Sequence, residues 1–304
     1  MTEFGWGDLA PLNEVHRTRS QKPRRMGLTM VIDTGLGVST TKEIVEVAGH
    51  HIDQWKCSFG TSAFVPKGVL REKLEFLESE GIQTFPGGTL FEACIIRHHC
   101  RLYMARAREL GFTAVEISDG TIDLPVFRRR RVIECAIDGG LRAITEVGKK
   151  DPARRLPPET LAEQALDDLE NGAEAVIIEG RESGKGVGIF DQDGNVDVKA
   201  METIAEIMGD ALHRLIWEAP LKKQQAALIQ RFGPNVSLGN IEPQKVLALE
   251  ALRAGLRFET LQPIADALLD TGEWQPDRVE PRLPPTQGLR LPVVAHGGDV
   301  DGKG

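Results

Sequence analysis

Four glutamates stand at the ends of successive short apolar runs, namely Glu116, Glu146, Glu179 and Glu218. A carboxylate in a buried strand is costly unless it is paired, hydrogen-bonded or bound to a metal. Carboxylate oxygens are hard ligands, which suit Mg²⁺ better than zinc. We therefore predict a Mg²⁺ site formed by these glutamates, with Asp33 at the end of an earlier apolar run as a further candidate ligand.

Three lysines lie close to the ends of the same kind of run, and they are candidate catalytic residues: Lys56, Lys149 and Lys150. The pKa of a lysine shifts readily on burial, so its ammonium can donate a proton as well as anchor an anion. Lys149 and Lys150 are adjacent, so in extended chain they point to opposite sides and we expect one of them to face the site. The alternative is that Lys56, Lys149 and Arg181 form purely structural ion pairs with the glutamates.

The segment EGRESGKGVGIF is a glycine-rich loop that follows the third of these glutamates. It is not a Walker motif, because Lys185 is followed by glycine rather than serine or threonine. A glycine-rich loop can still offer backbone N–H groups to a phosphate. We therefore expect an anionic substrate. The candidate substrate-binding residues are Arg181, Lys185, Ser183, Gly184, Thr61, Ser62 and Asn240.

The elements that must position these side chains alternate along the chain. Eight short apolar runs, each followed by a segment with helical spacing of apolar residues, recur about every 30 residues, which suits a βα unit. The middle of the chain has no linker, and no GxGxxG follows the first run, so two doubly wound sheets are disfavoured. We predict an α/β fold with a single (β/α)₈ TIM barrel, whose chemistry lies at the carboxyl ends of its strands.

The predicted domain organisation is one catalytic barrel between two tails. The barrel covers residues 26–265, between a flexible N-terminal extension over 1–25 and a flexible C-terminal tail rich in proline and glycine over 266–304. The predicted helices include Thr41–Ala48, Gly68–Leu77, Phe91–Leu110, Pro158–Leu169, Val198–Met208, Leu221–Phe232 and Pro243–Leu256.

Composition restricts the class of partner. The 304 residues carry 37 basic and 45 acidic side chains, so the net charge of −8 argues against a nucleic-acid or anionic-membrane binder. No run of 18 apolar residues and no signal-peptide pattern is visible, and the four cysteines form no CxxC pair. We expect a cytoplasmic protein that acts on small anionic substrates, and a homo-oligomer for which a trimer is one option.

Three further patterns predict no additional site. Zinc binding by Cys94, His98, His99 and Cys100 is disfavoured, because adjacent histidines do not share a helix face. The basic run 128–131 is expected on a solvated helix face or a subunit contact rather than a nucleic-acid patch. No Gly-x-Ser-x-Gly elbow is present, which disfavours a serine hydrolase.

Several longer motifs lie between residues 25 and 260. They are GLTMVIDTGL, PGGTLFE, VEISDGTIDLP, TEVGKK, VIIEGRESGKG, EAPLKKQQ and FGPNVSLGNI, together with a lysine strand that leads into GTS. Across this range the chain resembles the phosphosulfolactate synthase family. The resemblance implies a Mg²⁺-dependent barrel lyase that adds sulfite to phosphoenolpyruvate, an early step toward coenzyme M. The product would be (R)-2-phospho-3-sulfolactate, formed through a Mg²⁺-stabilised enediolate that a lysine protonates. By position, Lys150 resembles the family's general acid.

The chain departs from the family's pattern near the first two strands and again late in the chain. Thr34 stands where familiar members have lysine, and Ser58 and Phe59 replace a glycine and a tryptophan. A later Gly-Asp-Thr reads Phe-Glu-Thr at residues 258–260. Two alternatives therefore stay open: addition of a different nucleophile to phosphoenolpyruvate, or a non-catalytic, stress-associated member of the family.

Overall fold

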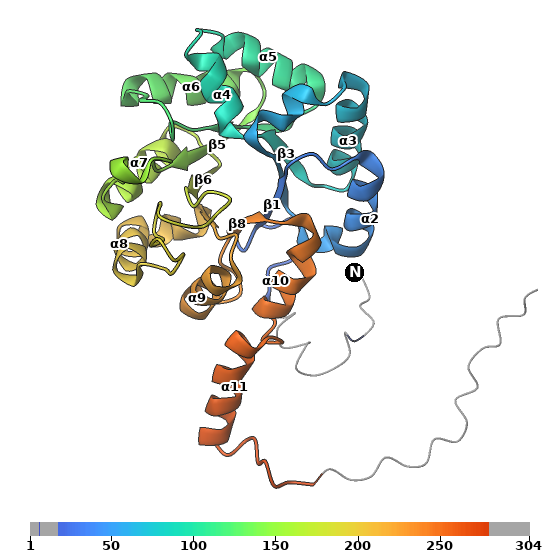
Figure 1. Cartoon of the computed structure of the whole chain (residues 1–304), viewed down its shortest axis with the longest axis vertical. Helices are drawn as coiled ribbons and strands as arrows, with labels where there is room; N and C mark the ends of the chain where they lie inside the picture. Colours follow the sequence, from blue (N-terminus) through green and yellow to red (C-terminus); the bar gives the residue numbers. More distant parts are fainter. Residues whose placement is uncertain (1–5, 7–17, 280–304) are drawn as a thin grey trace, which may run out of the picture. The chain divides into compact units, whose positions relative to one another are not determined.

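The computed structural model describes Trp6 and residues 18–279. Eight parallel strands form one sheet in the order β3-β2-β1-β8-β7-β6-β5-β4. The two end strands also meet, because the amide of Thr113 donates to the Thr84 carbonyl (3.1 Å) and the Thr84 amide donates to Thr113 Oγ1 (2.9 Å). The sheet is therefore a nearly closed barrel with helices around it (Figure 1), which confirms the predicted (β/α)₈ fold.

Each strand is short and is followed by a helix or a helical turn. The strands are β1 Thr29–Asp33, β2 Gln54–Cys57, β3 Gln83–Pro86, β4 Ala114–Ile117, β5 Arg142–Val147, β6 Ala175–Ile178, β7 Leu215–Glu218 and β8 Leu238–Ile241. The α-helices are α2 Val38–Ala48, α3 Lys67–Ser79, α4 Gly88–Ile95, α5 Cys100–Leu110, α6 Val126–Asp138, α7 Pro158–Glu170, α8 Val198–Met208, α9 Lys222–Phe232, α10 Val246–Arg253 and α11 Phe258–Asp270. Shorter 3₁₀ turns are η1 Gly49–His51, η2 Ser58–Phe64, η3 Pro152–Arg154, η4 Gly209–Arg214 and η5 Pro243–Lys245.

The prediction of one continuous helix over Phe91–Leu110 is wrong. The chain forms α4 and α5 with a break between them, where His98 has a φ of 59° and the His99 amide turns back to the Cys94 carbonyl (3.0 Å). A left-handed residue cannot continue a right-handed helix. The apolar spacing runs through this break, so the sequence pattern did not reveal it.

The chain divides into two units, residues 1–263 and 264–304, and α11 runs across that division. It also crosses the predicted domain boundary between residues 265 and 266. Most of the predicted flexible tails, namely residues 1–5, 7–17 and 280–304, lie outside the described residues. None of the described helices combines the length and the hydropathy of a membrane-spanning segment.

Strand alternation separates an inner core from an outer one. Within the barrel lies a cluster formed by Met30, Phe85, Ala114, Ile144, Ala175, Ile177 and Ile216. In β4, Ala114 belongs to this inner cluster, whereas Val115 and Ile117 pack in the larger cluster beneath the helices. Because successive side chains on a strand point to opposite sides, Glu116 faces inward above Ala114. The same period of two places the other strand-end glutamates and Lys56 over the inner core.

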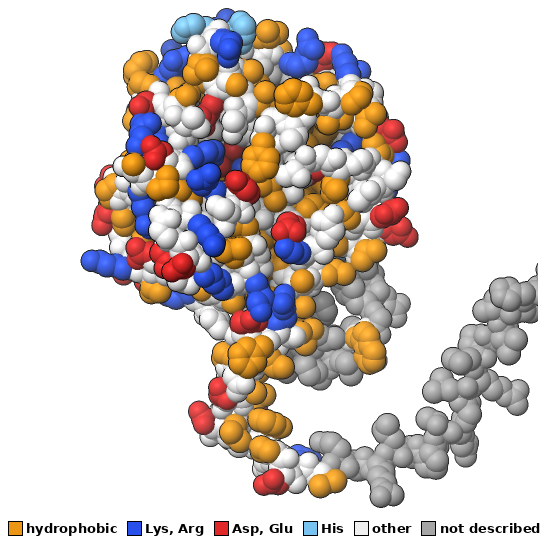
Figure 2. Space-filling view, in the orientation of Figure 1, with side chains coloured by type: hydrophobic (Ala, Val, Ile, Leu, Met, Phe, Trp, Pro, Cys, Tyr) orange, Lys and Arg blue, Asp and Glu red, His pale blue; other side chains and the backbone are white. Residues whose placement is uncertain are grey.

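The segment that precedes β1 contacts the opposite end of the barrel. Arg24 contacts Asp53 (3.1 Å) and the His50 carbonyl (3.0 Å), and Arg19 contacts Glu250 of α10 (3.0 Å). These ion pairs hold the described part of the N-terminal extension against the barrel. Over the visible face of the molecule, basic and acidic side chains are interspersed with apolar ones (Figure 2).

Candidate active site

A cavity of about 230 Å³ lies at the carboxyl ends of the strands. It brings together eight of the residues predicted from sequence: Glu116, Glu146, Glu179, Glu218, Lys56, Lys150, Arg181 and Asn240. It is also lined by Ile32, Ser58, Phe59, Gly87, Gly88, Thr89 and Glu182. The concentration of ionisable groups in one small cavity makes this the candidate active site.

Lys56 lies at the centre of the carboxylate cluster. Its Nζ lies 2.7 Å from Glu116 Oε2, 3.0 Å from Glu218 Oε1 and 3.3 Å from Glu146 Oε2. The side chain is only 7% exposed. Burial lowers the pKa of its ammonium, but the carboxylates of Glu116, Glu218 and Glu146 outweigh burial and raise the pKa well above the usual value. Lys56 is therefore a fixed positive charge that holds three glutamates together.

Lys150 is the more accessible of the two lysines in the cavity. Its Nζ donates to Glu146 Oε1 (2.7 Å) and also contacts Glu179 Oε2. The side chain is 30% exposed, against 7% for Lys56. Burial lowers the pKa of Lys150, but Glu146 and Glu179 raise it beyond the ordinary value. The raised pKa keeps this ammonium protonated, and its partial exposure lets it contact a molecule bound in the cavity.

Backbone amides bind the outer oxygens of three of the glutamates. The Gly88 N–H donates to Glu116 Oε1 (2.7 Å), the Gly180 N–H to Glu218 Oε2 (2.9 Å) and the Arg181 N–H to Glu179 Oε1 (2.7 Å). Gly88 must be glycine, because a Cβ there would lie 2.2 Å from Ser118 Oγ and 2.6 Å from Glu116 Oε1. The loops after β3 and β6 thus fix the carboxylates from outside.

The cluster carries more negative than positive charge when it is fully ionised. Four ionised glutamates and two lysines give this site a net charge of −2. Burial and the neighbouring carboxylates raise the pKa of Glu116 to about 7 and that of Glu179 well above its usual range. Burial also opposes ionisation of Glu146, yet Lys150 and Lys56 hold its pKa below the usual range. The excess negative charge would be neutralised by one divalent cation.

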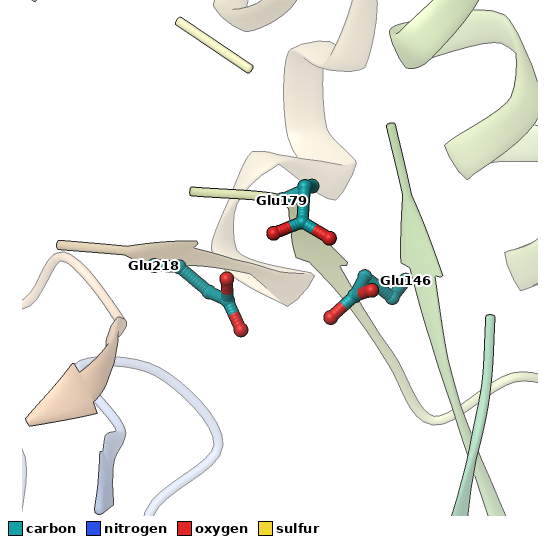
Figure 3. Close-up of side chains that lie close together, drawn as sticks. All are labelled: Glu146, Glu179 and Glu218. Carbon is teal, nitrogen blue, oxygen red and sulfur yellow. The ribbon is translucent and has the colours of Figure 1, made fainter. Parts of the chain in front are cut away.

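Three of the glutamates fit a metal ion. One oxygen from each of Glu146, Glu179 and Glu218 lies within 4.8 Å of the other two, and their carboxylates point toward a common space from the ends of three adjacent strands (Figure 3). Each carboxylate offers about four lone-pair positions, so the hydrogen bonds that the cluster already accepts leave room for ligation. This oxygen-only donor set suits Mg²⁺.

Two further residues of the cavity have unused polar capacity. Asn240 is 3% exposed, has a φ of 55°, and its Oδ1 has no hydrogen-bond partner among the described residues. The Arg181 guanidinium forms no ion pair within the described part of the chain. The Arg181 backbone has a φ of 57°, and its N–H donates a hydrogen bond to Glu179 Oε1. An orphaned buried amide and an unpaired guanidinium are both suited to a polar, anionic ligand.

The structure places other predicted site residues outside the cavity. Asp33 accepts hydrogen bonds from Trp55 Nε1 (2.8 Å) and from the Gly35 and Leu36 amides (2.8 Å each), and Lys73 binds the same carboxylate. The reason is that successive side chains of a strand point to opposite sides. Met30 and Ile32 of β1 face inward, so Asp33 faces the helices. Asp33 is thus not brought to the glutamate cluster.

Lys149 and the remaining loop residues also lie elsewhere. Lys149 Nζ binds the loop after β4, at Asp119 and Ile122. Thr61 Oγ1 donates to the Ser58 carbonyl (2.8 Å), and buried Ser62 lines a separate, mostly apolar cavity. Beyond Arg181, the β6–α8 loop residues Ser183, Gly184 and Lys185 do not line the active-site cavity, and two of them, Ser183 and Lys185, are exposed.

Sequence reasoning did not assign several cavity and supporting residues. Ser58, Phe59 and Thr89 line the cavity, and the neighbouring PGG segment supplies the amide that binds Glu116. Two adjacent glycines at a strand end were the available signal, because they allow close backbone approach. Arg129 was expected in a solvated basic run, but it is 1% exposed and is paired with Asp168 (2.6 Å), which corrects that expectation.

Comparison with known proteins supports this architecture. The sequence profile of the (2R)-phospho-3-sulfolactate synthase (ComA) family matches residues 17–259. A phosphosulfolactate synthase from Methanothermobacter thermautotrophicus is 39% identical over 245 residues, which cover 80% of this chain and 94% of the relative. Those from Methanocaldococcus jannaschii and Bacillus subtilis are 41% and 37% identical, over 77% and 80% of this chain and 93% and 95% of the relatives. The chain therefore belongs to the phosphosulfolactate synthase family and is a (β/α)₈-barrel enzyme of that family.

Proposed function

We propose that this protein is a lyase that adds sulfite to phosphoenolpyruvate and forms (R)-2-phospho-3-sulfolactate. The observation that carries the proposal is the cavity in which four buried glutamates surround Lys56 and Lys150, in a chain of this family. Both substrates are small anions, and a cavity of about 230 Å³ is of a size for such molecules. Lys150 and Arg181 supply cationic groups on its wall.

The glutamate cluster would hold Mg²⁺ through Glu146, Glu179 and Glu218. When bound, this ion supplies positive charge beside the substrate carboxylate, where negative charge develops during addition. Lys56 remains necessary in this arrangement, because it keeps Glu146 and Glu218 at fixed positions and neutralises Glu116.

The chain's own residues then bind the substrate and transfer one proton. Arg181, whose guanidinium has no ion-pair partner among the described residues, would bind the phosphate. The sulfite sulfur attacks the methylene carbon, a C–S bond forms, and the π electrons move into the carboxylate as an enediolate. Lys150 donates its proton to the phosphate-bearing carbon, a C–H bond forms as the carboxylate is restored, and the neutral amine regains a proton from solvent.

A second candidate function is addition of another nucleophile, such as a thiol, to the same acceptor. The side chain of Phe59 is the observation that favours it, because this aromatic residue lines the cavity and is 49% exposed. Sulfite offers no apolar surface to such a ring, whereas an organic nucleophile does.

The discriminating experiment incubates the purified protein with phosphoenolpyruvate and Mg²⁺, with either sulfite or a small organic thiol. Mass spectrometry then identifies the product. A sulfonate that forms only with sulfite and Mg²⁺ supports the first proposal, and a thioether adduct selects the second. Absence of either product, together with no Mg²⁺-dependent consumption of phosphoenolpyruvate, would refute both.

A further inference from the structure

The loop between β4 and α6 contacts Lys150 through Gly120. The Gly120 carbonyl accepts a hydrogen bond from the Lys150 amide (2.9 Å). A Cβ placed on Gly120 would lie 3.0 Å from Lys150 Cγ and 3.2 Å from Lys150 Nζ. The Lys150 side chain therefore packs directly against the bare α-carbon of this glycine.

Lys149 holds the turn that contains Gly120 in place. Its Nζ donates to the Asp119 carbonyl (2.7 Å), to Asp119 Oδ2 (2.9 Å) and to the Ile122 carbonyl (2.9 Å). These three bonds enclose the four-residue turn that contains Gly120. The lysine is only 9% exposed, so its hydrogen bonds are shielded from water.

Arg129 links the same turn to the strand that carries the carboxylates. It donates to Asp119 Oδ1 (3.1 Å) and to the Glu146 carbonyl (2.9 Å), and its guanidinium is held by Asp168. Asp119 is thus shared by Lys149 and Arg129. The turn, the end of β5 and both partners of Lys150 form one connected set of contacts (Glu146 and Glu179 in Figure 3).

We propose that Lys149 is a positioning residue which, through Asp119 and Gly120, holds the ammonium of Lys150 in its reactive position. This inference rests on the proposed function, since it assigns proton donation to Lys150. Catalytic groups must be held within about 0.5 Å of the productive geometry, and a misplacement of about 1 Å can cost about 100-fold in rate. The buried hydrogen bonds of Lys149, together with the packing of Gly120 against the Lys150 side chain, meet that demand.

Substitutions at Gly120 test the packing of this glycine against Lys150 and leave the hydrogen bonds of Lys149 intact. Gly120→Ala should lower kcat for sulfonate formation about tenfold and Gly120→Val about 100-fold, with KM for phosphoenolpyruvate within about threefold of wild type. Gly37→Ala is the matched control, because a Cβ at Gly37, in the loop after β1, meets nothing within 4 Å. A kcat within about threefold of wild type in Gly120→Val would overturn the proposal.

Lys149→Met and Lys149→Arg test the hydrogen bonds between Lys149 and the loop that contains Gly120. Methionine should lower kcat about tenfold with KM little changed, and arginine, which can still donate to Asp119, should restore most of the loss. Equal losses in both variants, or a loss confined to KM, would contradict a positioning role. Thermal unfolding of each variant shows whether it is folded at the assay temperature.

A measurement independent of turnover separates this inference from the proposed function. Trace acetylation with acetic anhydride, read by peptide mass spectrometry, reports how readily the Lys150 amine reacts. Displacement from Glu146 and Glu179 should raise its labelling rate several-fold in Gly120→Val but not in Gly37→Ala. If the wild type makes no sulfonate, the proposed function fails while this readout still decides the positioning role. An unchanged labelling rate in Gly120→Val refutes that role.

Discussion

Lys149 and Lys150 are adjacent in the chain, yet their ammonium groups serve different parts of the structure. Lys150 Nζ binds Glu146 in the active-site cavity, 2.7 Å away, whereas Lys149 Nζ binds the Asp119 carbonyl, also 2.7 Å away, in the loop after β4. Both lysines lie in the irregular segment just after β5, where Gly148 has a φ of 122°. The consequence is that one lysine can reach a bound substrate and the other holds the surrounding loop.

Replacement of Lys150 should abolish turnover without unfolding the protein. General acid catalysis contributes about 10²–10⁴-fold in rate, so we expect Lys150→Ala to lower kcat by at least about 100-fold. The control is Lys42→Ala, which removes an exposed lysine of α2 that pairs with Glu72. Steady-state kinetics measures the effect, and activity of Lys150→Ala within about threefold of wild type would rule out Lys150 as the proton donor.

Mg²⁺ should stabilise the folded protein through the glutamate cluster. A ligand present at about 100 times its Kd adds about 2.7 kcal/mol to the free energy of unfolding. Thermal unfolding with MgCl₂, compared with NaCl at the same ionic strength, measures this effect. We expect Glu179→Gln to remove most of the Mg²⁺-dependent shift.

The matched control for that experiment is Glu92→Gln. Glu92 is a buried glutamate near the same end of the barrel, but it binds Ser118 Oγ (2.7 Å) and the Thr121 amide (3.1 Å) and does not line the cavity. Its substitution should leave the Mg²⁺-dependent shift unchanged. A wild-type protein that shows no shift, or equal shifts in both variants, would contradict the assigned metal ligands.

Asp33 and Lys73 predict a specific pH dependence of stability. Burial raises the pKa of the Asp33 carboxyl, but Lys73 and the hydrogen bonds to Trp55 and Leu36 outweigh burial and lower it below the usual value of 3.8. A depressed pKa in the folded state means that the stabilisation is present above about pH 3.8 and is lost as pH falls further. The buried pair therefore stabilises the protein at neutral pH.

Lys73→Met leaves the Asp33 carboxylate buried without its cation. We expect the free energy of unfolding at pH 7 to fall by about 3–5 kcal/mol. Below about pH 4 the loss should shrink, because a protonated Asp33 no longer needs the ammonium. Urea denaturation across this pH range measures both effects. A destabilisation that is independent of pH would show that Lys73 acts through packing alone.

Gln224 should control substrate affinity through the β6–α8 loop. Its Nε2 donates to the carbonyls of Gly184 (2.7 Å) and Gly194 (3.1 Å), so it anchors the loop that begins at Arg181. Gln224→Leu should raise KM for phosphoenolpyruvate about tenfold, with a smaller change in kcat, because each lost buried hydrogen bond costs about 1 kcal/mol. The exposed Gln230 of the same helix donates to the Glu259 carbonyl (2.6 Å) and, within the described part of the chain, does not bind the β6–α8 loop, so Gln230→Leu should leave KM unchanged.

The fold was predictable because its signals are local and repeated. Eight apolar runs alternate with helical spacing, and the strand-end glutamates share the inward parity of Ala114 and Ile144. The same parity, applied to β1, would have placed Asp33 outside the barrel. The break between α4 and α5 carried no such signal, because His98 adopts a left-handed conformation within an uninterrupted apolar pattern.

The partners of individual side chains were the part that could not be predicted. Lys56 lies 90 residues from Glu146 and 162 residues from Glu218 in sequence, and only barrel closure brings them together. Arg129 looked like one of four exposed arginines, but its helix faces Asp168 of α7. Such long-range pairs depend on how helices and strands pack, which spacing along the chain does not encode.

The central claim, sulfite addition followed by protonation from Lys150, is tested most directly in D₂O. Wild-type protein is incubated with phosphoenolpyruvate, sulfite and Mg²⁺, and the product is analysed by mass spectrometry and NMR. Because the Lys150 ammonium exchanges with solvent, we expect a sulfonate with a single deuterium, on the phosphate-bearing carbon, and no product from Lys150→Ala. Failure of the wild-type protein to form any sulfonate, or a sulfonate without deuterium at that carbon, would contradict the proposed function.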